Sequence, residues 1–247
     1  MIRNGKQYRR GVIAALVLLV VPIILTRAPL AKSGGNPGVI PPTARPYGLT
    51  YGEWSAKWWQ WAFSLPVNQN PFFDETGCVN GANGQSGPVW FLTGVINVSG
   101  SATRTCTVPV GKALFFPILN FECDNLCPPI VPPATPAELR GFCADAMDGA
   151  VNMTCEVDGV SIQGLNPVTT TPYRVLSPVF NVTLPDNSVQ QFFECDVTPG
   201  TYSPFVSDGV FLMLAPLSRG QHTIHFHGEL PSFGGFTLDI TYNLTVR

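Results

Sequence analysis

The chain has 247 residues, a formal net charge of −2 and only 12% charged residues, so its composition excludes a basic nucleic-acid-binding surface. Its 24 glycines and 24 prolines indicate many turns between short elements, which favours a mainly β fold over an all-helical one. Hydrophobic residues make up 45% of the chain, as in packed globular proteins, and the length allows one large domain or two small ones.

The first 33 residues have the order of a secretory signal. Residues 1–10 are basic and carry no acid, residues 11–25 carry no charge, and small residues follow up to residue 33. The apolar run is shorter than the roughly 20 residues that a membrane-spanning helix needs, so we predict a signal peptide over residues 1–33. An uncleaved N-terminal anchor is the alternative, and only that alternative predicts a membrane association. Both predict a secreted, periplasmic or cell-surface protein.

A Gly/Pro linker and a short helix are expected next. Residues 34–48 are rich in glycine and proline, and such a linker would hold the folded part away from a membrane or a neighbour. Thr50 and Glu53 then have the spacing of a capping box, which predicts that a helix begins there. Pro66 ends it.

The predicted helix carries large aromatic residues on one face, at Trp54, Trp58 and Trp61. This pattern is typical of a helix that closes the open side of a β core, although a sugar-binding or membrane-interface surface is the alternative. Trp59 lies off that face. We therefore predict that Trp59 is exposed and name it as the candidate ligand-binding residue.

Two strand regions and a second helix follow. Residues 87–98 and 104–120 have strand patterns. Thr135, Pro136 and Glu138 predict the start of a second short helix, which Gly149 ends. The expected buried stripe of this helix consists of Leu139, Phe142, Cys143 and Ala146.

From residue 150 onward every segment has a β pattern. Residues 179–193 and 208–228 predict hairpins, and residues 237–246 alternate between apolar and polar side chains. Such alternation is typical of an antiparallel sheet with one buried face. We predict a mainly β protein, in which residues 49–247 form a single disulfide-bonded domain: an antiparallel β-sandwich or jelly-roll-like fold with two short helices.

Seven cysteines lie after the predicted signal. In an oxidising compartment six would pair and one would be left over, but the spacing leaves the connectivity open.

Four acidic residues flank apolar runs, and we interpret them as solvated loop ends, with a carboxylate pair or calcium site as the alternative. They are Asp74, Glu75, Glu122 and Asp124.

All three histidines lie in one predicted strand, at His222, His225 and His227. His225 and His227 share a face of that strand, and imidazole is a common ligand of divalent metals. A hairpin with the last strand can place His225 opposite Asp239, which predicts a metal site of His225, His227 and Asp239. The alternative is a cross-strand charged pair without a metal.

Three blocks resemble segments of a family of uncharacterised exported bacterial proteins. They read YGEWSAKWWQW, GQSGPVWFLTG and CTVPVGKALFFPILN, and the resemblance covers roughly residues 47–124 and the C-terminal block. It implies a bacterial exported protein with no assigned activity, and it assigns no functional residue.

Three hypotheses for function follow from these patterns. The leading one is a non-enzymatic extracytoplasmic or cell-surface domain that binds a ligand or a partner, with a protein or a glycan as the expected partner. The second is a metal-dependent enzyme or metal-binding protein that uses the His225/His227 strand and a divalent metal. The third is a structural component of the envelope.

Overall fold

The computed structural model describes residues 38–96, 100–127 and 129–247; the predicted signal segment lies outside them. The helices are α1 (Tyr51–Phe63), α2 (Pro136–Asp148) and α3 (Val189–Phe192), and short 3-10 helices span Pro46–Gly48, Val67–Gln69 and Pro71–Phe73. The strands are β1 (Val89–Phe91), β2 (Ser101–Val108), β3 (Ala113–Cys123), β4 (Val151–Val157), β5 (Val160–Ser161), β6 (Arg174–Leu176), β7 (Phe180–Leu184), β8 (Gly200–Leu214), β9 (Gly220–Leu230) and β10 (Phe236–Val246). The prediction of a mainly β fold is confirmed.

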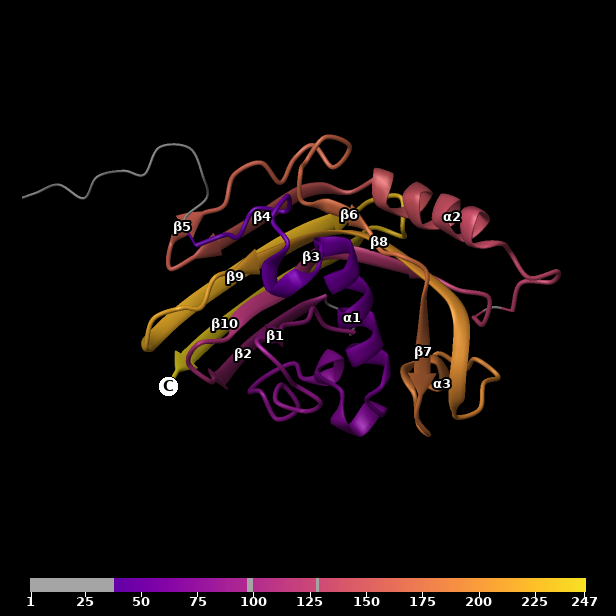
Figure 1. Cartoon of the computed structure of the whole chain (residues 1–247), viewed down its shortest axis with the longest axis horizontal. Helices are drawn as coiled ribbons and strands as arrows, with labels where there is room; N and C mark the ends of the chain where they lie inside the picture. Colours follow the sequence, from indigo (N-terminus) through magenta and orange to yellow (C-terminus); the bar gives the residue numbers. More distant parts are fainter. Residues whose placement is uncertain (1–37, 97–99, 128) are drawn as a thin grey trace, which may run out of the picture. The chain divides into compact units, whose positions relative to one another are not determined.

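The strands form two sheets (Figure 1). The first has the order β1-β3-β8-β6, with β7 also paired to β8, and the second has the order β2-β10-β9-β4-β5. Both sheets are mixed rather than antiparallel, because β1 runs parallel to β3 and β2 runs parallel to β10. Alternation of apolar and polar residues along a strand predicts which side chains are buried. The alternation is the same whether the neighbouring strand is parallel or antiparallel, so it could not predict the direction of the neighbours.

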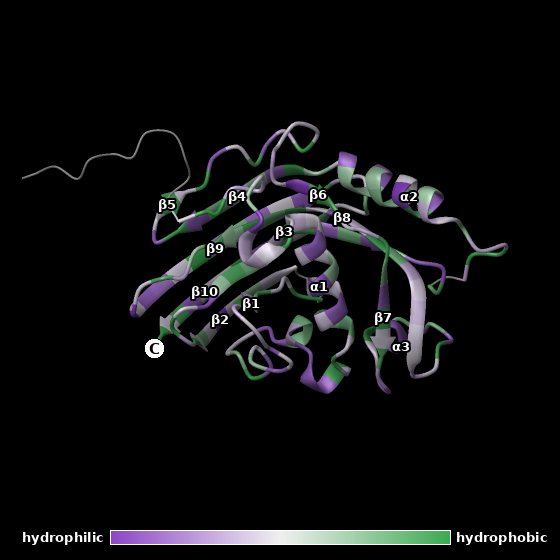
Figure 2. Cartoon of the chain, in the orientation of Figure 1, coloured by the Kyte–Doolittle hydropathy of each residue, from purple (hydrophilic) through white to green (hydrophobic). Residues whose placement is uncertain are grey.

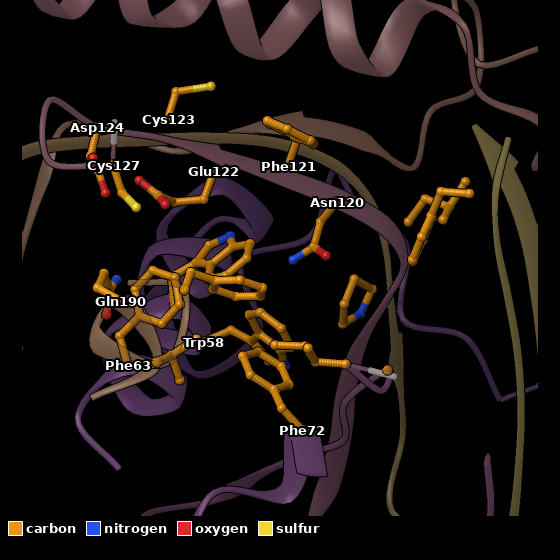
Figure 3. Close-up of a pocket in the computed structure, with 18 of the residues that line it drawn as sticks. Trp58, Phe63, Phe72, Asn120, Phe121, Glu122, Cys123, Asp124, Cys127 and Gln190 are labelled. Carbon is orange, nitrogen blue, oxygen red and sulfur yellow. The ribbon is translucent and has the colours of Figure 1, made fainter. Parts of the chain in front are cut away.

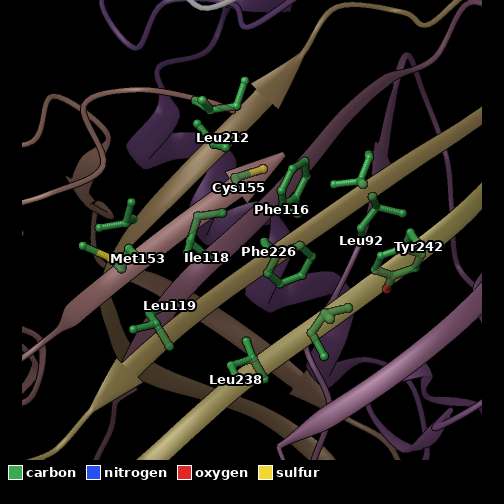
Figure 4. Packing of buried hydrophobic residues seen from close by; sticks show 14 of the residues in the cluster. Leu92, Phe116, Ile118, Leu119, Met153, Cys155, Leu212, Phe226, Leu238 and Tyr242 are labelled. Carbon is green, nitrogen blue, oxygen red and sulfur yellow. The ribbon is translucent and has the colours of Figure 1, made fainter. Parts of the chain in front are cut away.

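Side chains from the two sheets meet in a shared core (Figure 4). The Phe116 ring on β3 lies 5.3 Å from the Phe226 ring on β9, and Leu212, Ile240 and other apolar residues surround this contact. Along β9 and β10, hydrophobic and hydrophilic residues alternate (Figure 2). The predicted core face of the last strand is therefore confirmed.

The other face of the first sheet is covered by α1. The Trp58 ring lies 6.2 Å from Phe211 on β8, and Phe211 stacks on Phe115 of β3 at 5.1 Å. Because both faces of β3 and β8 are buried, their sequences are nearly continuous apolar runs rather than alternating ones. The interpretation of the tryptophan face as core is confirmed, since Trp54, Trp58 and Trp61 are all buried.

The end of the expected linker packs on the first sheet. Val39 forms a bridge with Leu214, and the backbone N–H of Ile40 donates to the carbonyl of Met213 at 2.8 Å. The Tyr51 hydroxyl of α1 donates to the Ile40 carbonyl. Residues 39 and 40 are thus part of the fold, and the chain joins the domain before residue 49.

Both predicted capping boxes are present, at Thr50 and at Thr135. In α2, however, Phe142 is 52% exposed while Met147 is buried. The buried stripe consists of Leu139, Cys143 and Met147, and Cys143 is bonded to Cys123 of β3.

The predicted hairpin over residues 179–193 is wrong in its second half. Its first half is β7, but α3 follows instead of a strand. Ser188 and Gln191 cap α3 with reciprocal hydrogen bonds. This S-x-x-Q pattern was visible in the sequence and is an N-terminal helix signal.

Six cysteines form disulfides, and Cys155 is free and buried, as the predicted count requires. The pairs are Cys78–Cys106, Cys123–Cys143 and Cys127–Cys195. Three disulfides fit an exported protein. Among the described residues, no helix is both long enough and apolar enough to cross a membrane.

Candidate functional site

A pocket of about 600 Å³ lies between α1, α3 and the C-terminal half of β3 (Figure 3). Aromatic and aliphatic side chains make up most of its wall. Those from α1 and the following 3-10 helix are Trp58, Trp59, Phe63 and Phe72. Polar side chains come mainly from β3 and α3: Asn120, Glu122, Asp124 and Gln190.

A β-bulge turns the polar side chains of β3 toward the pocket. Up to Pro117 the odd-numbered residues of β3, such as Phe115, face α1. The pairing with β8 shifts register between Pro117 and Leu119, so that Leu119 now faces the core between the sheets. An extra residue in one strand reverses which face the following side chains occupy.

Beyond the bulge, Asn120 and Glu122 point to the aromatic side of the pocket, whereas Phe121 and Cys123 point away from it (Figure 3). Gly209 lies opposite Asn120 on β8. A Cβ atom at Gly209 would lie only 2.6 Å from the Asn120 Cβ, so the close approach of the two strands requires glycine there.

Unpaired polar atoms are concentrated at this pocket. Over the described part of the chain, five buried side-chain nitrogen or oxygen atoms have no hydrogen-bond partner in the protein. Four of them belong to residues that line the pocket: Trp59 Nε1, Asn120 Nδ2, Glu122 Oε1 and Gln190 Oε1. Buried polar groups are nearly always paired, so this cluster marks a place where the protein alone does not complete its hydrogen bonds.

The two acidic residues of the pocket are half-buried. Burial raises the pKa of Glu122 well above its ordinary value, and the neighbouring Asp124 raises it further. Burial also raises the pKa of Asp124, against the opposing effect of backbone N–H groups from Leu126 and Cys127. Our interpretation of these two acids as solvated loop ends is therefore wrong for both.

Arg104 supports the wall of the pocket from the second sheet. The residue is 1% exposed, and its guanidinium donates to the carbonyls of Pro71, Asp74, Thr93 and Gly94 at 2.7–2.9 Å. Pro71 and Asp74 flank the lining residue Phe72, and Thr93 precedes the lining residue Gly94. A side chain of β2 thus fixes loops that shape the pocket.

A disulfide and two phenylalanines define the edge of the pocket. Cys127, beyond the end of β3, is bonded to Cys195, beyond the end of α3, and both line the pocket. Phe142 and Phe193 also line it, yet they are 52% and 54% exposed. Aromatic residues that touch both the cavity and the solvent form an apolar mouth.

Trp59 was predicted to be exposed, and this is wrong, because only 9% of it is exposed. Its ring packs 4.9 Å from the rings of both Trp58 and Phe63. Trp59 belongs to the same buried apolar cluster as Phe72 and Val189, so α1 is covered on more than the face that meets the sheet. Trp59 nevertheless lines the pocket, so it stays a candidate ligand-binding residue for a different reason.

The histidine strand has a different register from the predicted one. Asp239 lies opposite His227, and Thr241 lies opposite His225. The Asp239 carboxylate still contacts both rings, at 3.1 Å from His225 Nε2 and 3.3 Å from His227 Nδ1. His227 Nε2 lies 3.2 Å from Glu229 Oε1.

These side chains make polar contacts on the partly exposed face of the second sheet. Searched over the described residues, the structure has no group of three or more His, Cys, Asp or Glu side chains that could hold a metal ion. His225, His227 and Asp239 form a cluster of polar contacts across two strands, and a metal ion at these residues stays a prediction.

Comparison with known proteins adds no assignment. No protein-family model and no curated protein matches the chain. Among solved structures, a cysteine protease inhibitor, EhICP2, from Entamoeba histolytica aligns with 13% sequence identity over 71% of this chain and 100% of its own. The TM-score of that alignment is 0.23, a value too low to support an argument about fold or function.

Proposed function

We propose that this protein is an exported, non-enzymatic binding protein that holds a small, largely apolar molecule in the pocket between α1, α3 and β3. The observation that carries the proposal is the concentration of unpaired polar atoms there, on Trp59, Asn120, Glu122 and Gln190. Ligand sites are typically apolar concave pockets with a few placed polar groups, and they range from about 300 to 1,000 Å³.

The composition of the pocket favours binding over catalysis. Among the residues that the structure describes, the lining includes no serine, threonine, tyrosine, lysine or histidine, and its three cysteines are disulfide-bonded. Covalent catalysis needs an activated nucleophile beside a base. The two carboxyl groups are thus the ionisable groups of the lining, and an aromatic wall faces them.

The test is a binding titration with an apolar fluorescent probe, N-phenyl-1-naphthylamine, which is neutral near pH 7. Wild-type protein is expected to bind one probe per chain and to increase its fluorescence. Asn120→Phe places a bulky ring in the pocket and is expected to weaken binding about tenfold or more. Thr245→Phe, on the outer face of β10, is the matched control.

Two results would contradict the proposal. One is the absence of saturable binding by the wild-type protein. The other is unchanged affinity in a folded Asn120→Phe variant. Native mass spectrometry of the purified protein, followed by solvent extraction, would identify any molecule retained from the producing cell.

A further inference from the structure

We infer that the pocket selects an organic cation: a molecule with an ammonium group on an apolar body. This inference rests on the proposed function and names the class of ligand. It is carried by the placement of the ionisable groups among the described lining residues, Glu122 and Asp124, against an aromatic wall.

The ionisable side chains of the described lining are both acidic. Glu122 and Asp124 lie two residues apart and face the same side of the pocket (Figure 3). Asp124 accepts a hydrogen bond from the backbone N–H of Leu126, whereas Glu122 Oε1 has no partner in the protein. Over the described part of the chain, the lining residues from α1, α2, α3, β10 and the loops include no lysine, arginine or histidine. An unpaired carboxyl oxygen in such a place favours the neutral form of the group, and a ligand ammonium would supply the positive partner that lets it ionise.

Two further side chains point to a ligand independently of the acids. Gln190 is 5% exposed and Trp59 is 9% exposed, and each has an unpaired polar atom in the pocket wall. The Gln190 Oε1 atom accepts hydrogen bonds, so it suits a second N–H of the same ammonium. Trp59 Nε1 is a donor and suits an oxygen elsewhere on the ligand. These atoms lie just beneath the pocket surface, and a ligand reaches them through the side-chain rotations common in binding.

The aromatic wall suits a cation as well as an apolar body. The rings of Trp58 and Trp59 are 4.9 Å apart and perpendicular, and those of Trp58 and Phe72 are 5.6 Å apart. A cation within about 6 Å of an aromatic face is attracted by the ring quadrupole, most strongly for tryptophan. The ring faces repel an anion, for which the unpaired donors Trp59 Nε1 and Asn120 Nδ2 would be the compensation among the buried atoms of the described lining.

The proton balance gives the pocket a recognisable pH dependence. Asp124 is the titratable lining group beside Glu122. Burial raises the pKa of the Glu122 carboxyl, so an arriving ammonium displaces the proton from that carboxyl to solvent. The affinity for a cation should therefore rise with pH until Glu122 is fully ionised, while the affinity for a neutral molecule with the same body should not rise.

The experiment compares three ligands that share one apolar chain: decylamine, decan-1-ol and decanoate, each below its micelle concentration. Binding is measured by calorimetry to the wild-type protein, to Glu122→Gln, and to Glu156→Gln as the matched control on the exposed side of β4. We expect the order decylamine, decanol, decanoate from tightest to weakest. Glu122→Gln should weaken decylamine by roughly 30-fold or more, since it removes one partner of a buried charge pair, and should leave decanol nearly unchanged.

The outcomes separate this inference from the proposed function. If all three ligands bind equally and Glu122→Gln changes none of them, the pocket binds apolar molecules and the cation inference is overturned. If none of the three binds, and the fluorescent probe does not bind either, the proposed function itself fails. Should Glu122→Gln not fold, the wild-type titration from pH 5 to 9 decides: decylamine affinity that does not rise relative to decanol overturns the inference.

Discussion

Arg104 is a buried cation that is paired with backbone carbonyls and with the Tyr242 hydroxyl rather than with a carboxylate. Its guanidinium donates to four carbonyls, and one nitrogen also donates to Tyr242 Oη at 2.7 Å. We predict that Arg104→Met, which keeps much of the side-chain volume, lowers the free energy of unfolding by about 4 kcal/mol or more. Each buried acceptor that loses its donor costs about 1–3 kcal/mol, and relaxation of the loops recovers part of the sum for four.

Arg104→Lys tests the same reasoning more finely. Lysine keeps the charge but has three donors instead of five, so we expect a loss of about 2 kcal/mol for the acceptors that it cannot reach. Because those carbonyls hold the segments at Phe72 and Gly94, probe binding in the pocket should weaken as well.

The assay is urea unfolding followed by tryptophan fluorescence, with the free energy extrapolated at constant m-value. Arg219→Met, in the exposed turn before β9, is the control and should change stability by less than about 0.5 kcal/mol. If Arg104→Met is as harmless as the control, the hydrogen bonds of Arg104 do not support the fold and the reasoning is refuted.

Three further outcomes are expected. Replacing both Cys78 and Cys106 by serine should lower stability by about 3–4 kcal/mol, the chain-entropy value for a loop of this length, and equal urea midpoints would contradict it. The hydrogen bond to Asp158 raises the pKa of His222. The contribution of His222 to stability is therefore complete below pH 6.5 and is lost as the pH rises through the raised pKa. The difference in melting temperature between wild type and His222→Gln should be larger at pH 5.5 than at pH 8.5. Burial raises the pKa of Cys155 to about 12, so the native protein should resist alkylation at pH 8 and take up one label in urea, as mass spectrometry would show.

Several features were predictable from the sequence because they depend on neighbours along the chain. The capping boxes at Thr50 and Thr135 are local hydrogen bonds, and both are present. The alternation along residues 237–246 assigned the buried face of the last strand correctly. The number of disulfides followed from the cysteine count, since an exported chain pairs what it can.

The pocket was not predictable, because a bulge between Pro117 and Leu119 reverses the alternation on which the prediction depends. Without the bulge, Asn120 and Glu122 would face the core between the sheets. In the sequence they are only polar residues in or beside an apolar run, and nothing there marks them as pocket residues. The register of β9 and β10 has the same origin: a shift of two residues preserves every face, so the sequence could not choose between Asp239 and Thr241 as the residue opposite His225.

The sequence by itself therefore determined where the two capped helices begin, which face of the last strand is buried and how many cysteines pair, but it did not determine α3. Only the tertiary structure decided which strands are neighbours, where β3 bulges, and that Trp59, Glu122 and Gln190 line the same pocket. The physical reason is that local hydrogen bonds and periodicity act over a few residues, whereas these three side chains come from α1, β3 and α3 and meet only when α1 and α3 pack beside the first sheet.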